Sequence, residues 1–249
     1  MQLNSVTQLN SIILLLPLFI DILFAMKYYI VDSSSDWSVV GNHYPQVHDF
    51  IKGYNPDESA NGIFALYDPF LFPIATPNLS GLKLASGANY TDFLSQGFSG
   101  DLFLFNEKAK SVLDTIHIDK EYKIYPAKVI SLRKKMEKDY YMMKIISENF
   151  HHVDFANSVI TRNVDNVKMP IEVSSCQEFM MTYRNKEKRG EWDRSLQFSQ
   201  IRMSQEFYDL NLDLFQIGKI DFLWYASPKF VNAIVAKGLT GLQFEEVEL

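Results

Sequence analysis

The chain has 249 residues and a net charge of −6, from 24 lysines and arginines against 30 aspartates and glutamates. Hydrophobic residues make up 47% of the sequence, which is enough for a real core and excludes a fully disordered chain. The single cysteine, Cys176, excludes an internal disulfide framework and a multi-cysteine zinc site, and the acidic balance argues against a duplex-DNA binder.

Residues 12–26 near the amino terminus are almost entirely apolar. A helix over this range spans about 22 Å, less than the roughly 30 Å of a membrane's hydrocarbon core. A secretory signal is also disfavoured, because the first basic residue is Lys27. Three interpretations stay open: an apolar helix packed on the body, a weak membrane anchor, or sequence upstream of the true start. We favour the third, in which residues 1–25 are an extension, Met26 is the initiator and the domain is residues 26–249.

Two short elements are predicted at the start of this domain. A strand is expected over residues 26–32, where β-branched and aromatic residues follow one another. A short helix is expected over residues 44–51, because Val47, Phe50 and Ile51 would share one side of it.

A long ordered loop region is predicted between residues 53 and 100. It holds four of the nine prolines and six of the eleven glycines, which disfavour long regular elements. It also holds many apolar residues, so we expect it to pack over the core and to display some of its aromatic side chains.

Regular structure is expected from residue 101 onward. The predicted elements are a strand at 101–105, a helix at 107–117, and a hairpin of strands at 122–132 and 140–147. Asn106 is expected to cap the helix, and the charged residues 133–139 to form the hairpin turn. Both faces of the second hairpin strand are largely apolar, so we expect both to be covered.

The carboxyl-terminal part predicts four more strands and one helix. The strands are expected at 169–173, 196–203, 220–226 and 242–247, and the helix at 228–237, with Phe230, Val231, Ile234 and Val235 as its apolar stripe. Ser227 and Pro228 are typical of a helix start, and Gly238 of a helix end. Pro170 indicates an edge strand or a strand start.

These elements predict one α+β domain with a mixed or mostly antiparallel sheet, short helices and a long ordered loop region. A strand that begins with aspartate and leads into a capped helix occurs twice, at 101–108 and 221–229. Because such units are common, we favour this ordinary explanation over an internal duplication.

The histidines and the cysteine do not predict a metal or catalytic site. His43 and His48 would diverge by about 140° on a helix. His151 and His152 would point to opposite faces of a strand. No signature ties a histidine to Cys176, so a buried or incidental thiol is favoured. Phosphate-binding loops and the nucleophile elbow are absent from the sequence, and no cofactor is expected.

Charged clusters are interpreted as solvated surface. The basic clusters at 133–138 and 184–189 lie in predicted turns and are interrupted by glutamate, which disfavours a nucleic-acid partner. The acidic residues 245–248 are expected to lie on a solvated strand edge.

Several runs of residues carry a family resemblance. They are 103–113, 125–129, 140–145, 226–230 and 238–244, with Val153, Asp154 and Ser158 between them and the start at 26–30. Together they resemble a family of immunity proteins from bacterial polymorphic toxin systems, long known as a domain of unknown function. The likeness covers most of residues 26–249 and is best in 101–158 and 220–247.

The resemblance implies a cytoplasmic, non-catalytic protein that binds the carboxyl-terminal domain of a cognate protein toxin and neutralises it by occlusion. It implies no site residues, so the catalytic and metal sites are expected to be none and the interface is left unassigned. The alternative is an enzyme, a hydrolase or transferase whose site is assembled from scattered residues. A membrane-associated protein is a third reading, which depends on residues 12–26.

Overall fold

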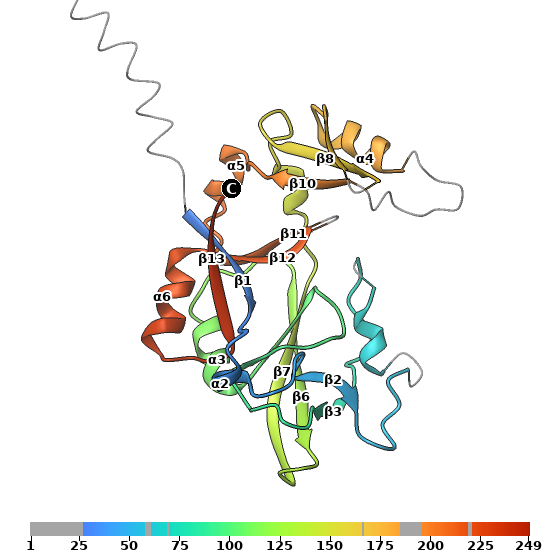
Figure 1. Cartoon of the computed structure of the whole chain (residues 1–249), viewed down its shortest axis with the longest axis vertical. Coiled ribbons are helices and arrows are strands. Elements are labelled where there is room, and N and C mark those ends of the chain that lie inside the picture. Colours follow the sequence, from blue (N-terminus) through green and yellow to red (C-terminus); the bar gives the residue numbers. More distant parts are fainter. Residues whose placement is uncertain (1–26, 58–60, 69, 166, 185–195, 219–220) are drawn as a thin grey trace, which may run out of the picture.

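Three β-sheets organise the chain, and short helices cover or connect them (Figure 1). The computed structural model describes residues 27–57, 61–68, 70–165, 167–184, 196–218 and 221–249. Residues 1–26, with the favoured start at Met26, and most of the predicted loop at 184–190 lie outside this part of the chain. The predicted α+β class with mostly antiparallel strands is confirmed.

The largest sheet has six strands. In spatial order they are β2 (Val47–Phe50), β3 (Leu79–Leu84), β6 (Tyr122–Ser131), β7 (Met136–Ile145), β5 (Leu102–Phe105) and β4 (Phe93–Leu94). The pair β3 and β6 is parallel and the other pairs are antiparallel, so the sheet is mixed. The predicted hairpin is confirmed as β6 and β7, although β7 begins at Met136 rather than at residue 140.

One prediction in the first half of the domain is wrong. The expected helix at 44–51 is strand β2, whose pairing with β3 and the burial of Val47 outweigh the helical spacing. The expected long loop region is confirmed, and it includes the short strand β3, which lies between β2 and β6 and buries Leu79 and Leu82. Gly81 is required within β3, because a side chain there would overlap the ring of Tyr54.

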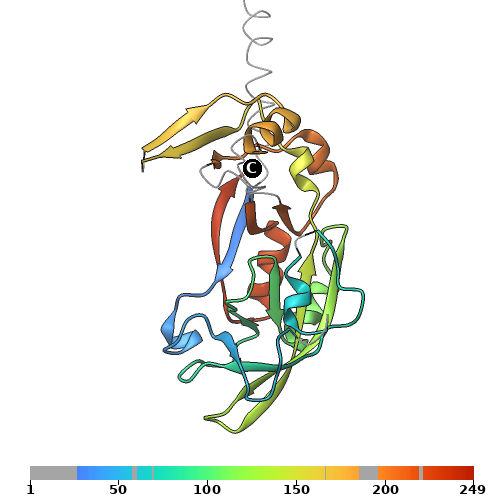
Figure 2. The same cartoon turned by 90° about the vertical axis from the view of Figure 1, so that its right-hand side faces the viewer.

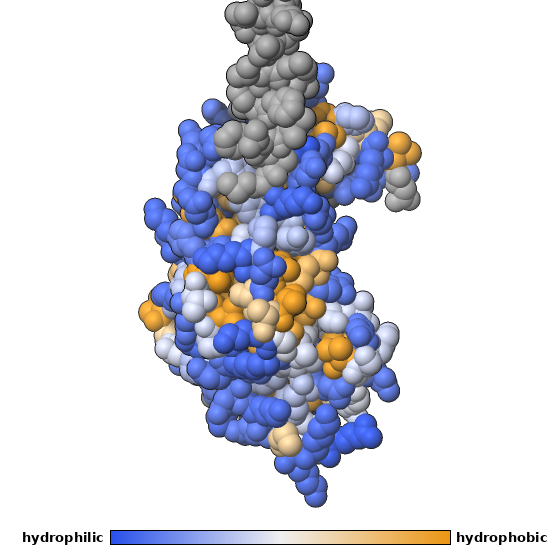
Figure 3. Space-filling view, turned by 90° about the vertical axis from the view of Figure 1, so that its left-hand side faces the viewer, coloured by the Kyte–Doolittle hydropathy of each residue, from blue (hydrophilic) through white to orange (hydrophobic). Residues whose placement is uncertain are grey.

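The second sheet has four strands in the order β11 (Leu214–Gly218), β12 (Asp221–Ala226), β1 (Lys27–Ser33) and β13 (Leu242–Glu248). Helix α6 (Pro228–Ala236) begins as predicted, with the Ser227 hydroxyl accepting from the Phe230 N–H. Gly238 follows it with φ of 56°, a conformation that favours glycine. Val235 was expected in the apolar stripe but is 68% exposed. On the side of the molecule where α6 lies, Figure 3 shows a group of hydrophobic residues.

The two predicted strand–helix repeats have the same topology. Helix α3 (Glu107–Leu113) follows β5, and Asn106 caps it as predicted, by accepting from the Ala109 N–H. The sheet orders β4-β5-β7-β6 and β11-β12-β1-β13 then correspond strand for strand, with α3 and α6 each leading from the second strand to the fourth. The third strand is β7 in the first unit and β1, from the amino-terminal end of the domain, in the second. The sequence favours a common unit over a duplication, and that choice stays a prediction, but the similarity now extends beyond one strand and one helix.

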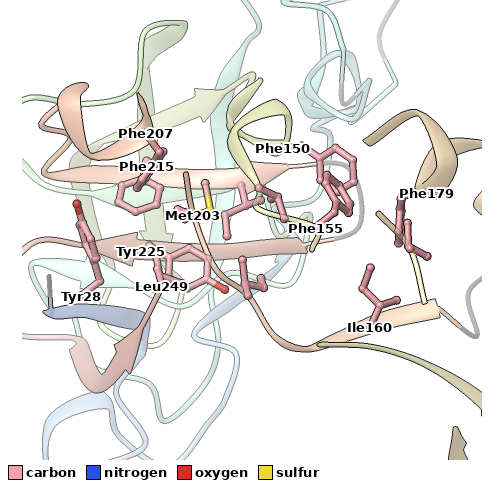
Figure 4. Packing of buried hydrophobic residues seen from close by; sticks show 14 of the residues in the cluster. Tyr28, Phe150, Phe155, Ile160, Phe179, Met203, Phe207, Phe215, Tyr225 and Leu249 are labelled. Atoms are coloured by element: carbon pink, nitrogen blue, oxygen red, sulfur yellow. The ribbon is translucent and has the colours of Figure 1, made fainter. Parts of the chain in front are cut away.

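The third sheet forms the top of the molecule in Figure 1. Its order is β10 (Leu196–Gln200), β8 (Val159–Val164) and β9 (Val167–Ile171), so Pro170 lies in an edge strand as predicted. Helix α4 (Cys176–Arg184) packs against it through Phe179, and Phe150 and Phe155 meet the Phe179 ring (Figure 4). The same core cluster continues to Tyr28, so this sheet shares its core with the four-stranded sheet.

The remaining elements are short. They are α2 (Trp37–Val40), α5 (Gln205–Asp209) and the 3-10 turns η1 (Ile63–Leu66) and η2 (Asn149–His152). Turn η1 anchors the long loop region, because Ile63 and Leu66 are fully buried. Turn η2 connects the end of β7 to the third sheet and contacts β11.

Candidate functional site

An exposed apolar surface lies on the loop segment that begins at η1, in front of the six-stranded sheet in Figure 2. Its large hydrophobic side chains are between 37% and 108% exposed. We call it the 64–74 surface, and it comprises Phe64, Tyr67, Phe70, Leu71 and Ile74. Scattered exposed hydrophobic residues are ordinary, but a group in one short segment is typical of an interaction site. The aromatic display expected of the 53–100 region is therefore confirmed.

The buried side chain of Lys144, in β7, holds the loop segment of the 64–74 surface in place. Its side chain is fully buried, and its ammonium donates to the carbonyl oxygens of Leu66, at 2.6 Å, and Asp68. The Asp101 carboxylate lies 3.7 Å from the ammonium. Burial lowers the pKa of Lys144, and the charge of Asp101 opposes that shift. The sequence signal for this buried ammonium is a single lysine inside the apolar run YYMMKII, from which no buried ion pair was predicted.

A second contact fixes the start of the same segment. The Tyr54 hydroxyl donates to the Asn78 carbonyl at 2.6 Å and accepts from the Ile63 N–H at 3.3 Å. The surface also extends onto β12, because Phe70 and the exposed Phe222 line one small cavity. Polar contacts at Ile63, Leu66 and Asp68 thus hold the first part of the segment in one arrangement.

A pocket of about 400 Å³ lies where the end of β7, η2 and the segment before β11 meet. We call it the 117–152 pocket, and it is lined by His117, Asp119, Lys120, Glu121, Ile146, Glu148, Asn149, His152, Leu210 and Leu212. Asp119 is 4% exposed, and its Oδ2 accepts from Asn149 Nδ2 at 2.7 Å. Burial raises the pKa of Asp119.

The pocket brings together two histidines that the sequence did not connect. His117 Nδ1 lies 3.1 Å from the Asn211 carbonyl oxygen. Because a carbonyl oxygen only accepts, this contact places a proton on Nδ1 and leaves Nε2 as an acceptor in the neutral ring. His152 lines the same pocket from η2. No group of three or more histidine, cysteine or acidic residues in the described ranges is arranged to hold a metal ion.

The other predicted histidine positions differ from expectation. His43 and His48 do not lie on a helix, and their rings stack with centroids 5.0 Å apart. His151 and His152 belong to a 3-10 turn rather than a strand, and only His152 lines the 117–152 pocket. His151 Nδ1 lies 3.6 Å from Cys176 Sγ, at the start of α4. The structure therefore joins a histidine to the cysteine, a contact that no sequence signature indicated.

The basic cluster at 133–138 and the acidic residues 245–248 occupy the surface positions expected of them. Lys134 and Lys138 lie near the β6–β7 turn, and the Lys138 ammonium lies 4.7 Å from the centre of the Tyr90 ring. The acidic residues at the end lie on β13, an edge strand, where Glu246 pairs with Lys27 at 2.8 Å. The basic residues 185–189 lie outside the described part of the chain.

Family models and curated proteins give no relative of this chain, since none of either kind matches it. Within the described residues, no helix has the length and apolar character needed to cross a membrane. The resemblance to immunity proteins therefore stays a prediction.

Proposed function

We propose that this chain is a binding protein without catalysis, which neutralises a cognate bacterial toxin by covering it. The single observation that supports this most is the 64–74 surface, an apolar group displayed on a segment that buried contacts hold in place. The class of partner comes from the resemblance alone. We also propose that the protein acts in the cytoplasm, which cell fractionation tests; recovery in the membrane pellet would favour an anchor at residues 12–26.

The geometry suits protein binding on physical grounds. A specific interface needs about 800 Å² per partner, with aromatic and aliphatic anchors near its centre. The 64–74 surface and Phe222 offer such anchors. Since Lys144 and Tyr54 already order the segment, little conformational entropy remains to be lost on binding.

If a toxin gene lies immediately upstream of this gene, the test is complex formation with the carboxyl-terminal domain of that toxin. We expect the two proteins to co-purify with sub-micromolar affinity, and Leu71→Asp to weaken binding about 100-fold by placing a charge in the interface. The matched control is Val235→Asp on α6, an equally exposed site that should keep full affinity. Absence of a complex, or equal loss in both variants, would contradict the proposal.

The enzyme alternative gains one specific observation, the contact between Cys176 and His151. A nucleophilic cysteine needs such a base, usually oriented by a third group. In the described ranges the His151 ring makes no second hydrogen bond, which weakens the enzyme reading.

Thiol reactivity distinguishes the two readings. We expect iodoacetamide to modify Cys176 slowly at pH 6 and faster with rising pH, as an ordinary thiol does, because only the thiolate reacts. Mass spectrometry of the modified peptide follows the rate, with Cys176→Ser as the blank. Fast modification at pH 6 that His151→Gln abolishes would favour an enzyme.

A further inference from the structure

The 117–152 pocket carries more negative than positive charge. Asp119, Glu121 and Glu148 line it, and none of the three forms an ion pair with another described residue. Lys120 is the one lysine in the lining, and it too makes no ion pair there. With neutral imidazoles, three carboxylates face one ammonium, and the excess charge attracts a cation.

The pocket also has an apolar wall. Ile146, Leu210 and Leu212 supply it, while Asp119 and Asn149 form a buried polar floor. A volume of about 400 Å³ is large enough for a small organic molecule or a long side chain. An occupant that matches both parts carries an aliphatic stem and a polar, positively charged end.

The hydrogen-bonding groups favour a donor over an acceptor. The carboxylates only accept when ionised, and neutral His117 accepts through Nε2 because Nδ1 is engaged by Asn211. An ammonium group has three donors and a guanidinium has five. A cation beside Asp119 would also offset the cost of burying that carboxylate, which is the cause of its raised pKa.

We propose that the 117–152 pocket binds an ammonium or guanidinium group carried on an aliphatic stem. The group comes either from a free aliphatic diamine or from a lysine or arginine side chain of a partner protein. The pocket is distinct from the 64–74 surface, so this site does not depend on the proposed docking there.

Three five-carbon ligands that differ in charge test the proposal on the full chain. Cadaverine, 1,5-pentanediol and glutarate are titrated at pH 8 and low ionic strength, and shifts of the His117 and His152 ring signals are followed by NMR. We expect cadaverine to bind about tenfold more tightly than pentanediol, and glutarate not to bind. The proposal would be overturned if glutarate bound most tightly of the three, or if cadaverine and pentanediol bound with equal affinity.

Charge variants supply the matched control. Glu148→Gln removes one exposed carboxylate with little risk to the fold and should weaken cadaverine binding about fivefold. Glu245→Gln makes the same change on β13, away from the pocket lining, and should leave binding unchanged. An equal effect in both variants would show only a general response to net charge and would refute a specific site.

A further arm identifies the source of the cation. Nα-acetyl-lysine amide imitates a lysine side chain within a protein. If it binds at least as tightly as cadaverine, the pocket is assigned to a partner's side chain. If it binds more weakly, the pocket is assigned to a free amine. Leu71→Asp should retain cadaverine binding. Failure at the pocket and failure of toxin docking are therefore separate results.

Discussion

Replacing Lys144 with methionine should lower the free energy of unfolding by about 3–5 kcal/mol. The substitution keeps the volume of the side chain but removes the ammonium that faces Asp101 and two carbonyl oxygens. Asp101 is then left as a buried carboxylate without a cation, and its Oδ2 already accepts no hydrogen bond. Urea denaturation followed by circular dichroism measures the loss.

The control is Lys128→Met, in the neighbouring strand of the same hairpin. Lys128 also pairs with a carboxylate, Glu137, but both side chains are about half exposed, so the change should cost less than about 1 kcal/mol. A double variant with Asp101→Asn removes the orphaned charge and should recover part of the stability. A loss for Lys144→Met no larger than for Lys128→Met would contradict the role of the buried pair.

The same substitution should loosen the 64–74 surface before it unfolds the protein. The carbonyls of Leu66 and Asp68 lose their donor, so the segment's amides should exchange with solvent faster. Hydrogen exchange read by mass spectrometry compares this segment with the β6–β7 hairpin. Retained protection there would mean that apolar packing alone, through Ile63 and Leu66, orders the segment.

Local sequence signals account for the parts of the fold that were predicted correctly. Asn106 and Ser227 cap their helices through side chains only three residues from the groups they satisfy. The β6–β7 hairpin depends on two neighbouring apolar runs and a charged turn. In each case the deciding interactions join residues that are close in sequence.

Features built from residues that are far apart in the sequence were missed, because no local sequence signal reports such contacts. Strand β2 pairs with β3 across a long loop, and that pairing, not the helical spacing of Val47 and Phe50, decides its conformation. The 117–152 pocket joins the end of β7 to residues before β11, and Cys176 meets a histidine 25 positions away. A hydrophobic pattern assigns residues to the interior but does not say which polar side chains converge there.

Tyr28, Tyr140 and Tyr225 are buried in the core, and burial is the largest cause that raises the pKa of each. The pKa of Tyr28 rises to about 12, and the pKa values of Tyr140 and Tyr225 rise further. The Tyr140 hydroxyl donates to the Thr91 carbonyl and the Tyr225 hydroxyl donates to Asp221, each at 2.6 Å. These groups link the stability of the fold to alkaline pH.

Stability should therefore fall steeply above pH 10. The unfolded chain loses its tyrosine protons near pH 10 while the folded chain keeps them, so the stabilisation is complete below pH 10 and is lost as the pH rises. The shift of Tyr28 alone corresponds to about 3 kcal/mol, lost between pH 10 and 12. The lowered pKa of Lys144 acts in the opposite direction, but it is one group against several tyrosines. Urea denaturation from pH 8 to 11.5 measures how steeply the free energy of unfolding falls with pH. Tyr28→Phe should make this fall less steep, and Tyr44→Phe, at an exposed position, should leave it unchanged. Equal slopes in the unmodified protein and both variants would contradict the role of the buried tyrosines.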